Sequence, residues 1–249
     1  MGRKTTSIIF YRLPIFLENW KTYYSNERII LSEVKGVDSL MDNIKWLFFD
    51  VGYTLINEDK CHEKRIQNTV KRFQSSSGIT YESCYDAMVK ASREYKPPYL
   101  TALKTFGIEY YEPYDKELEE PYEQAGSVLK ELHKRYKIGV IANQSAGTAG
   151  RLMDFGLMDF IDLVMSSAEE GLAKPDIHFF KEALQRAGCT AGNTVMIGDR
   201  LDNDIFPAKR VGMATIWIKQ GFGGKQIPIS EAYIPDYIIT DLSELTKMF

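Results

Sequence analysis

The sequence predicts an α/β protein with a doubly wound, mostly parallel sheet and a small inserted helical domain. From residue 121 onward, short apolar runs of strand length alternate with amphipathic helical segments. This alternation is typical of strand–helix–strand units that build a Rossmann-like parallel sheet. Residues 59–120 are instead polar and rich in Lys, Glu and Tyr, which favours a helical insert that is separate from the sheet.

The elements follow in order along the chain. The continuous apolar run 44–49, which ends abruptly at Asp50, predicts a buried parallel strand. Helical spacing in 64–73 and 81–95 predicts helices within the insert, and 121–136 predicts the first helix after it. Further strands are predicted at 137–143, 161–167, 194–199, 214–218 and 236–240, and helices at 149–157, 175–188, 203–212 and the C-terminus.

These elements divide the chain into three parts. Residues 41–58 and 121–249 form the predicted Rossmann-like core, and residues 59–120 form the predicted helical cap. Residues 1–40 precede the first clear strand. We expect them to be an extension ahead of a start at Met41, or a peripheral helical segment.

Composition limits the classes of function. The chain has 249 residues, 26% of them charged, and a formal net charge of −3 at pH 7. A nucleic-acid-binding domain would usually show clustered Lys and Arg, so a small soluble ligand fits better. The three cysteines are scattered without a CxxC spacing, which favours a reducing cytoplasm over a disulfide framework. No apolar run reaches the roughly 18 residues of a membrane span, and nothing indicates an oligomeric state.

Polar residues follow the predicted strands at the edge where ligands bind in open α/β sheets. They combine carboxylates with one lysine, one amide and one hydroxyl: Asp50, Asn143, Ser145, Lys174, Asp199 and Asp204. Carboxylate oxygens suit Mg²⁺, which binds one or two carboxylates together with substrate phosphate. A lysine beside them can offset the charge of a phosphoryl group, and an aspartate near both is a candidate nucleophile.

Four segments carry a resemblance to a known family: FFDVGYTL (48–55), IGVIAN (138–143), AKPD (173–176) and IGDRLDND (197–204). In them the chain resembles the haloacid dehalogenase-like superfamily, whose members are mostly Mg²⁺-dependent phosphohydrolases, here with a helical cap between the first two segments. The resemblance implies that Asp50 forms an aspartyl-phosphate and ligates Mg²⁺ through its other oxygen. Asp199 would be a second metal ligand, with Asp204 reaching the metal directly or through water. Lys174 would hold Asp50 and the transferring phosphoryl group.

Two positions depart from the family's pattern. The family's phosphatases usually carry Asp two residues after the nucleophile, to protonate the leaving group and then activate water. Gly52 stands here instead, so the resemblance implies that its backbone carbonyl would still face the metal, while about 10²–10⁴-fold of general acid–base catalysis would be lost. Ala142 replaces a usual Ser or Thr, and Ser145 is the candidate to supply that hydroxyl. By the same resemblance, Asn143 would touch the phosphoryl oxygens and Thr54 would support the loop.

Four smaller features lie near these segments. Glu58 and Asp59 either act as substitute acids or lie in a solvated hinge. His62, on a predicted helix, is expected to be solvated. The segment GFGGK (221–225) lacks the full phosphate-loop pattern, so we expect a flexible surface loop.

The predicted function is a Mg²⁺-dependent phosphatase-like hydrolase that acts on a small phosphorylated metabolite through Asp50. Without its usual acid, it should favour substrates with good leaving groups. Two alternatives stay open. One is a dehalogenase or a phosphonate-cleaving member. The phosphonate-cleaving member would need a lysine that forms a Schiff base, and Lys96 is a candidate for it. The other is a catalytically impaired member that binds a phospho-ligand or a protein partner.

Overall fold

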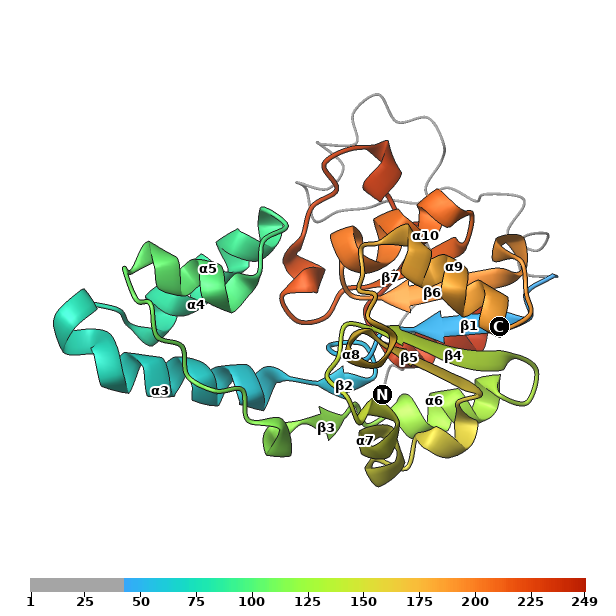
Figure 1. Ribbon diagram of the computed structural model, residues 1–249, viewed down its shortest axis with the longest axis horizontal. Helices are drawn as coiled ribbons and strands as arrows, with labels where there is room; N and C mark the ends of the chain where they lie inside the picture. Colours follow the sequence, from blue (N-terminus) through green and yellow to red (C-terminus); the bar gives the residue numbers. More distant parts are fainter. Residues whose placement is uncertain (1–42) are drawn as a thin grey trace, which may run out of the picture.

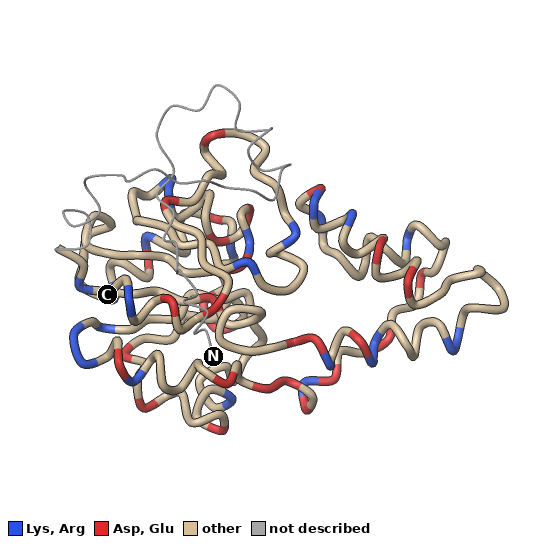
Figure 2. Tube along the Cα trace, turned by 180° about the vertical axis from the view of Figure 1, so that it is seen from behind, with Lys and Arg blue, Asp and Glu red and all other residues tan. Residues whose placement is uncertain are grey.

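The computed structural model describes residues 43–249, so the expectation for residues 1–40 lies outside the described part of the chain. Figure 1 shows a sheet with helices on both faces and a helical insert beyond the carboxyl ends of the strands, and Figure 2 shows from behind how this insert projects from the core. None of the helices in residues 43–249 combines the length and hydrophobicity that crossing a membrane requires.

Six parallel strands form the main sheet, in the spatial order β5-β4-β1-β6-β7-β8. Their bounds are β1 (Trp46–Phe49), β4 (Lys137–Ala142), β5 (Leu163–Ser166), β6 (Thr194–Gly198), β7 (Ala214–Ile218) and β8 (Tyr237–Ile239). Each strand predicted from the sequence is present, within one or two residues at either end. The predicted parallel α/β fold is therefore confirmed.

Helices cover both faces of this sheet (Figure 1). One face packs against α6 (Ala125–Leu132), α7 (Thr148–Asp154) and α11 (Leu245–Met248), and the other against α9 (Ile177–Arg186) and α10 (Phe206–Val211). Leu47 and Phe49 of β1 belong to the first core and Phe48 to the second, because successive side chains on a strand point to opposite faces. The strand is thus buried on both sides, which explains its continuous apolar sequence.

Shorter helical turns fill the connections between the larger elements. They are α8 (Ser167–Glu170), the 3₁₀ turns η1 (Lys116–Leu118), η2 (Met158–Phe160), η3 (Ala191–Asn193), η5 (Gly223–Lys225), η6 (Glu231–Tyr233) and η7 (Leu242–Glu244), and the π-helical turn η4 (Leu201–Ile205).

The helical insert consists of α3 (Asp59–Ser77), α4 (Tyr81–Arg93) and α5 (Pro98–Thr105). These helices share an apolar cluster that includes Ile66, Met88 and Leu103 and extends to Tyr53 and Phe222 of the core. Two short antiparallel strands, β2 (Ile56–Asn57) and β3 (Glu120–Pro121), connect the insert to the sheet. Because β2 follows directly on the loop after β1, the start of α3 lies close to the carboxyl end of β1.

Candidate active site

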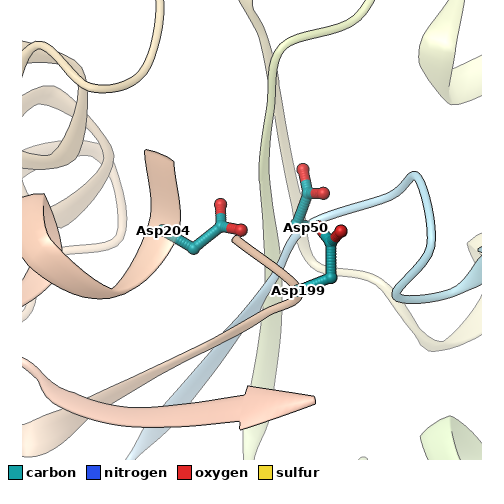
Figure 3. A group of neighbouring side chains, drawn as sticks. All are labelled: Asp50, Asp199 and Asp204. Atoms are coloured by element: carbon teal, nitrogen blue, oxygen red, sulfur yellow. The ribbon is translucent and has the colours of Figure 1, made fainter. Parts of the chain in front are cut away.

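Three aspartates converge at the carboxyl edge of the sheet, as Figure 3 shows. Asp50 follows β1 and Asp199 follows β6, and these two strands are neighbours in the sheet. Asp204 lies in the π-helical turn η4 just beyond. One carboxylate oxygen of each lies within 4.8 Å of the others. The structure therefore brings together three carboxylates that the sequence placed after two different strands.

Lys174 places one ammonium group between two of these carboxylates. Its Nζ donates to Asp50 Oδ1 and to Asp204 Oδ1, each at 2.6 Å. The side chain is only 2% exposed. Burial alone would lower the pKa of this ammonium, but the charges of Asp204 and Asp50 outweigh burial and raise it. Lys174 is therefore a permanently charged link between the two aspartates.

The acidic cluster carries more negative charge than Lys174 offsets. Burial, with the charges of Asp204 and Asp50, raises the pKa of Asp199 well above its usual range. Burial also raises the pKa of Asp204 to about 6, although Lys174 acts in the opposite direction. Three buried or half-buried oxygen ligands with an excess of negative charge fit a divalent cation such as Mg²⁺. Asp50, Asp199 and Asp204 are the residues that would hold it.

The loop after β1 is tightly wound. The Val51 carbonyl accepts hydrogen bonds from the backbone N–H groups of residues 54–56, at 2.9–3.2 Å. Tyr53 adopts a left-handed φ of 51°, which bulky residues rarely do, and its ring lies so close to Gly221 that a Cβ there would collide with it. Thr54 is fully buried, and its Oγ1 has no hydrogen-bond partner among the described residues. Thr54 thus packs beneath the loop and does not line the cavity.

Asn143 and Ser145, at the end of β4, contact other protein groups. Asn143 Oδ1 accepts from the Lys174 backbone N at 2.7 Å, and its Nδ2 donates to the Lys174 carbonyl at 2.8 Å. The amide therefore fixes the backbone of Lys174 while also lining the cavity. Ser145 is not among the residues that line the cavity, and its hydroxyl is hydrogen-bonded to Lys116 Nζ. Ala142 is buried in the core.

The carboxylates face a cavity of about 230 Å³, to which the insert contributes His62 and Pro98, and to which Glu58, just before the insert, also contributes. The expectation that His62 is solvated was wrong. Its ring stacks on Tyr53 with centroids 5.8 Å apart and meets Phe222 edge-on at 5.2 Å. The polar sequence around His62 gave no signal of this burial, because the partners of the ring lie outside the helix, in the loop after β1 and in the distant segment 221–225.

The segment 221–225 was expected to be a flexible surface loop, and this too was wrong. Phe222 is buried, and its carbonyl accepts a hydrogen bond of 2.7 Å from Ser92 Oγ in the insert. Gly223 lies against Asp199 so closely that a Cβ would be 2.5 Å from the Asp199 carbonyl oxygen. This segment therefore joins the insert to the acidic cluster, and its glycine is required by the close approach.

The sequence of this chain is similar to the sequences of known hydrolases. Residues 47–218 match the family described as haloacid dehalogenase-like hydrolase. The glyceraldehyde 3-phosphate phosphatase of Methanocaldococcus jannaschii is 32% identical, over 82% of this chain and 96% of its own. The protein of the same name from Pyrococcus furiosus is 27% identical, over 84% and 94%. The N-acylneuraminate-9-phosphatase of Rattus norvegicus is 24% identical, also over 84% and 94%.

Two solved structures show the same fold. A HAD phosphatase from Thermococcus onnurineus superposes with a TM-score of 0.59 at 23% identity, covering 82% of this chain and 97% of its own. The HAD-hydrolase YfnB from Bacillus subtilis gives a TM-score of 0.61 at 23% identity, covering 83% and 99%.

Proposed function

Because this chain belongs to the haloacid dehalogenase-like hydrolases, we propose that it is a Mg²⁺-dependent phosphatase of small phosphorylated metabolites, with Asp50 as its nucleophile. The observation that carries the proposal is the group formed by Asp50, Asp199, Asp204 and Lys174 at one end of a cavity. A nucleophilic carboxylate, an acidic cluster for a cation and a buried ammonium are the groups that phosphoryl transfer requires.

In the proposed reaction, Asp50 attacks the phosphorus atom and forms an aspartyl-phosphate that water then hydrolyses. Lys174 holds Asp50 Oδ1 in place and offsets the charge of the phosphoryl oxygens. Mg²⁺, when bound by the three aspartates, would neutralise the charge that they share with the phosphoryl group. We assign the Gly52 backbone carbonyl as a further ligand of that ion.

The remaining roles follow from the positions of the side chains. Asn143 keeps Lys174 aligned through its two backbone hydrogen bonds and borders the space for the phosphoryl group. Thr54 supports the loop from below, and Ser145 would need to leave Lys116 before it could bind substrate. We propose that the helical insert, residues 59–120, acts as a cap over the cavity, since His62 and Pro98 form part of its wall.

The relatives suggest the class of substrate. Their names describe phosphatases of glyceraldehyde 3-phosphate and of N-acylneuraminate 9-phosphate, both of which are small phosphomonoesters. We therefore propose a small cytoplasmic phosphomonoester as the substrate of this chain. A dehalogenase would keep Asp50 as its nucleophile but would need no metal, so it would leave Asp199 and Asp204 without a cation to hold, whereas a Mg²⁺-dependent phosphatase uses all three.

A panel of phosphomonoesters that includes glyceraldehyde 3-phosphate and p-nitrophenyl phosphate tests the proposal. We expect turnover that requires Mg²⁺, stops in EDTA and falls by more than about 10³-fold in Asp50→Asn. The control is Asp154→Asn, which alters an exposed carboxylate at the end of α7. Undiminished turnover in Asp50→Asn would contradict the mechanism. Binding of Mg²⁺ and a phosphate mimic without any turnover would select the impaired, ligand-binding alternative. Borohydride trapping with phosphonoacetaldehyde would select the phosphonate-cleaving one.

A further inference from the structure

The Glu58 carboxylate lies in the space that a side chain at position 52 would fill. A Cβ built on Gly52 would be 2.5 Å from Glu58 Oε1, 2.9 Å from its Cδ and 3.2 Å from Oε2. In an aspartate, a carboxylate oxygen lies two bonds from Cβ, or about 2.4 Å away. Glu58 therefore brings a carboxylate oxygen to about the distance from this Cβ at which the usual aspartate of this family would carry its own.

We propose that Glu58 is the general acid and base of this enzyme and replaces the carboxylate that Gly52 lacks. The proposal rests on the phosphatase function proposed above. It assigns to the residue that immediately precedes the insert a role that the family's phosphatases give to the loop after the first strand.

Among the described residues, the Glu58 carboxylate has one ion-pairing partner and no capping role. Glu58 is the N-cap residue of α3, yet its side chain makes no capping hydrogen bond. The first turn is capped instead by Asn57, whose Oδ1 accepts from the Asp59 backbone N at 2.8 Å. Within residues 43–249, that partner is His62, whose Nε2 lies 3.7 Å from Glu58 Oε2, beyond hydrogen-bonding distance. The carboxylate is therefore free to exchange a proton with substrate or water.

Glu58 also reaches the cavity, whereas its neighbour does not. Its side chain is 16% exposed, and it lines the same cavity as Asp50 and Lys174. Asp59, the other acid at this point of the chain, is exposed and is not among the residues that line the cavity. Of the two candidates, Glu58 alone can meet a leaving group on the phosphorus atom that Asp50 attacks.

The two half-reactions balance with Glu58 in this role. In the first, an Asp50 oxygen bonds to phosphorus, the bond from phosphorus to the ester oxygen breaks, and that oxygen takes the Glu58 proton to leave as an alcohol. In the second, the Glu58 carboxylate takes a proton from the water molecule whose oxygen bonds to phosphorus. The bond from phosphorus to Asp50 then breaks, which releases phosphate and leaves Glu58 protonated again.

Rapid-mixing kinetics of Glu58→Gln with p-nitrophenyl phosphate and phenyl phosphate test this role. Nitrophenolate departs without a proton, so its phosphoenzyme should still form while its hydrolysis is slow. We expect a burst of roughly one nitrophenolate per enzyme before the steady state, and a steady rate about 10²–10⁴-fold below wild type. Phenyl phosphate, with a poorer leaving group, should give no burst because both half-reactions are slow. A purely structural defect would not separate the two substrates.

Glu63→Gln is the matched control, since Glu63 is an exposed glutamate one turn further along α3. It should behave as wild type. A double variant tests whether the carboxylate can be moved from position 58 to position 52. The turnover of phenyl phosphate by Gly52→Asp/Glu58→Ala should exceed that by Glu58→Ala at least about tenfold. Equal turnover by the two variants would overturn the proposal that Glu58 replaces an aspartate at position 52.

Further outcomes distinguish a failure of the role of Glu58 from a failure of the proposed phosphatase function. Steady turnover of Glu58→Gln within about threefold of wild type, or a uniform loss without a burst, would overturn the role of Glu58. If wild type is active and Asp50→Asn is not, the proposed phosphatase function stands in either case. If wild type shows no turnover that depends on Asp50, the phosphatase function itself fails, and the role of Glu58 fails with it.

Discussion

Replacing Lys174 by Met should destabilise the metal-free protein strongly. The substitution keeps the length of the buried side chain but removes the ammonium that contacts Asp50 Oδ1 and Asp204 Oδ1, each at 2.6 Å. Both carboxylates would then remain beside Asp199 with no positive charge between them. The protein would have to fold around uncompensated negative charges.

The magnitude follows from the burial of this group. Breaking a buried ion pair by removing one partner costs about 3–5 kcal/mol, because an uncompensated charge stays behind. In a chain of 150–250 residues, 1 kcal/mol shifts the Tm by about 2–4 °C, so the Tm of Lys174→Met should fall by roughly 6–20 °C. The loss is a large share of the roughly 5–15 kcal/mol that stabilise a typical folded protein.

The loss of stability in Lys174→Met should depend on pH. Burial raises the pKa of Asp204 to about 6 in the folded protein, above its ordinary value of 3.8. Protonation of Asp204 therefore stabilises the folded protein. This contribution to the free energy of unfolding is fully present below about pH 4 and is lost as the pH rises through 6. The charge of Lys174 lowers the pKa of Asp204. Removing Lys174 therefore raises this pKa further and increases the loss of stability at neutral pH. Lowering the pH should then recover stability in Lys174→Met to a greater extent than in wild type.

Denaturant unfolding of the metal-free proteins, at about pH 7.5 and about pH 5, measures this effect. The control is Lys137→Met, which removes the same group from an ion pair with Asp162 whose lysine is 61% exposed. An exposed pair contributes only about 0–1 kcal/mol. A loss in Lys174→Met no larger than in Lys137→Met, or one independent of pH, would refute the reasoning.

Three other outcomes are expected. Mg²⁺ should raise the Tm at about pH 7.5 and far less at about pH 5, because Asp204, with its pKa of about 6, must release its proton to bind a cation; equal shifts in scanning fluorimetry would contradict this. Gly223→Ala forces a methyl group against Asp199 and should weaken Mg²⁺ binding in calorimetry, whereas Gly192→Ala, in open space, should not. Thr54→Val should change the unfolding free energy by less than about 1 kcal/mol, because Thr54 Oγ1 has no partner among the described residues; a larger loss in urea would reveal a hydrogen bond.

The sheet and its acidic cluster could be predicted because both depend on local sequence. Each strand is a short apolar run, and each polar residue that ends a strand must lie at the same edge when the strands are parallel. Asp50, Lys174 and Asp199 therefore met as expected. What the sequence could not give was the pairing of their charges, such as the shared contact of Lys174 with Asp204.

The wall of the cavity could not be predicted, because it depends on how distant segments pack. His62 is polar and lies in a polar helix, but its ring is enclosed by Tyr53 and Phe222 from two loops. The segment 221–225 contains glycines that usually indicate a flexible loop, yet the chain uses Gly223 for a close approach to Asp199. Hydrophobic periodicity describes one helix or strand at a time and carries no information about contacts between distant segments.

Identifying the acid near position 52 required both the sequence and the structure. The sequence showed that Gly52 lacks a carboxylate and named Glu58 and Asp59 as substitutes without deciding between them. Neighbouring side chains at a helix start point in directions about 100° apart, so the starting residue of α3 decides which acid enters the cavity. Asn57 caps the helix through the Asp59 backbone N, which leaves Glu58 as the N-cap residue facing Gly52. Because only a glycine leaves room for that carboxylate, an aspartate at position 52 would have to displace Glu58, and the two residues are alternatives for one position in the site.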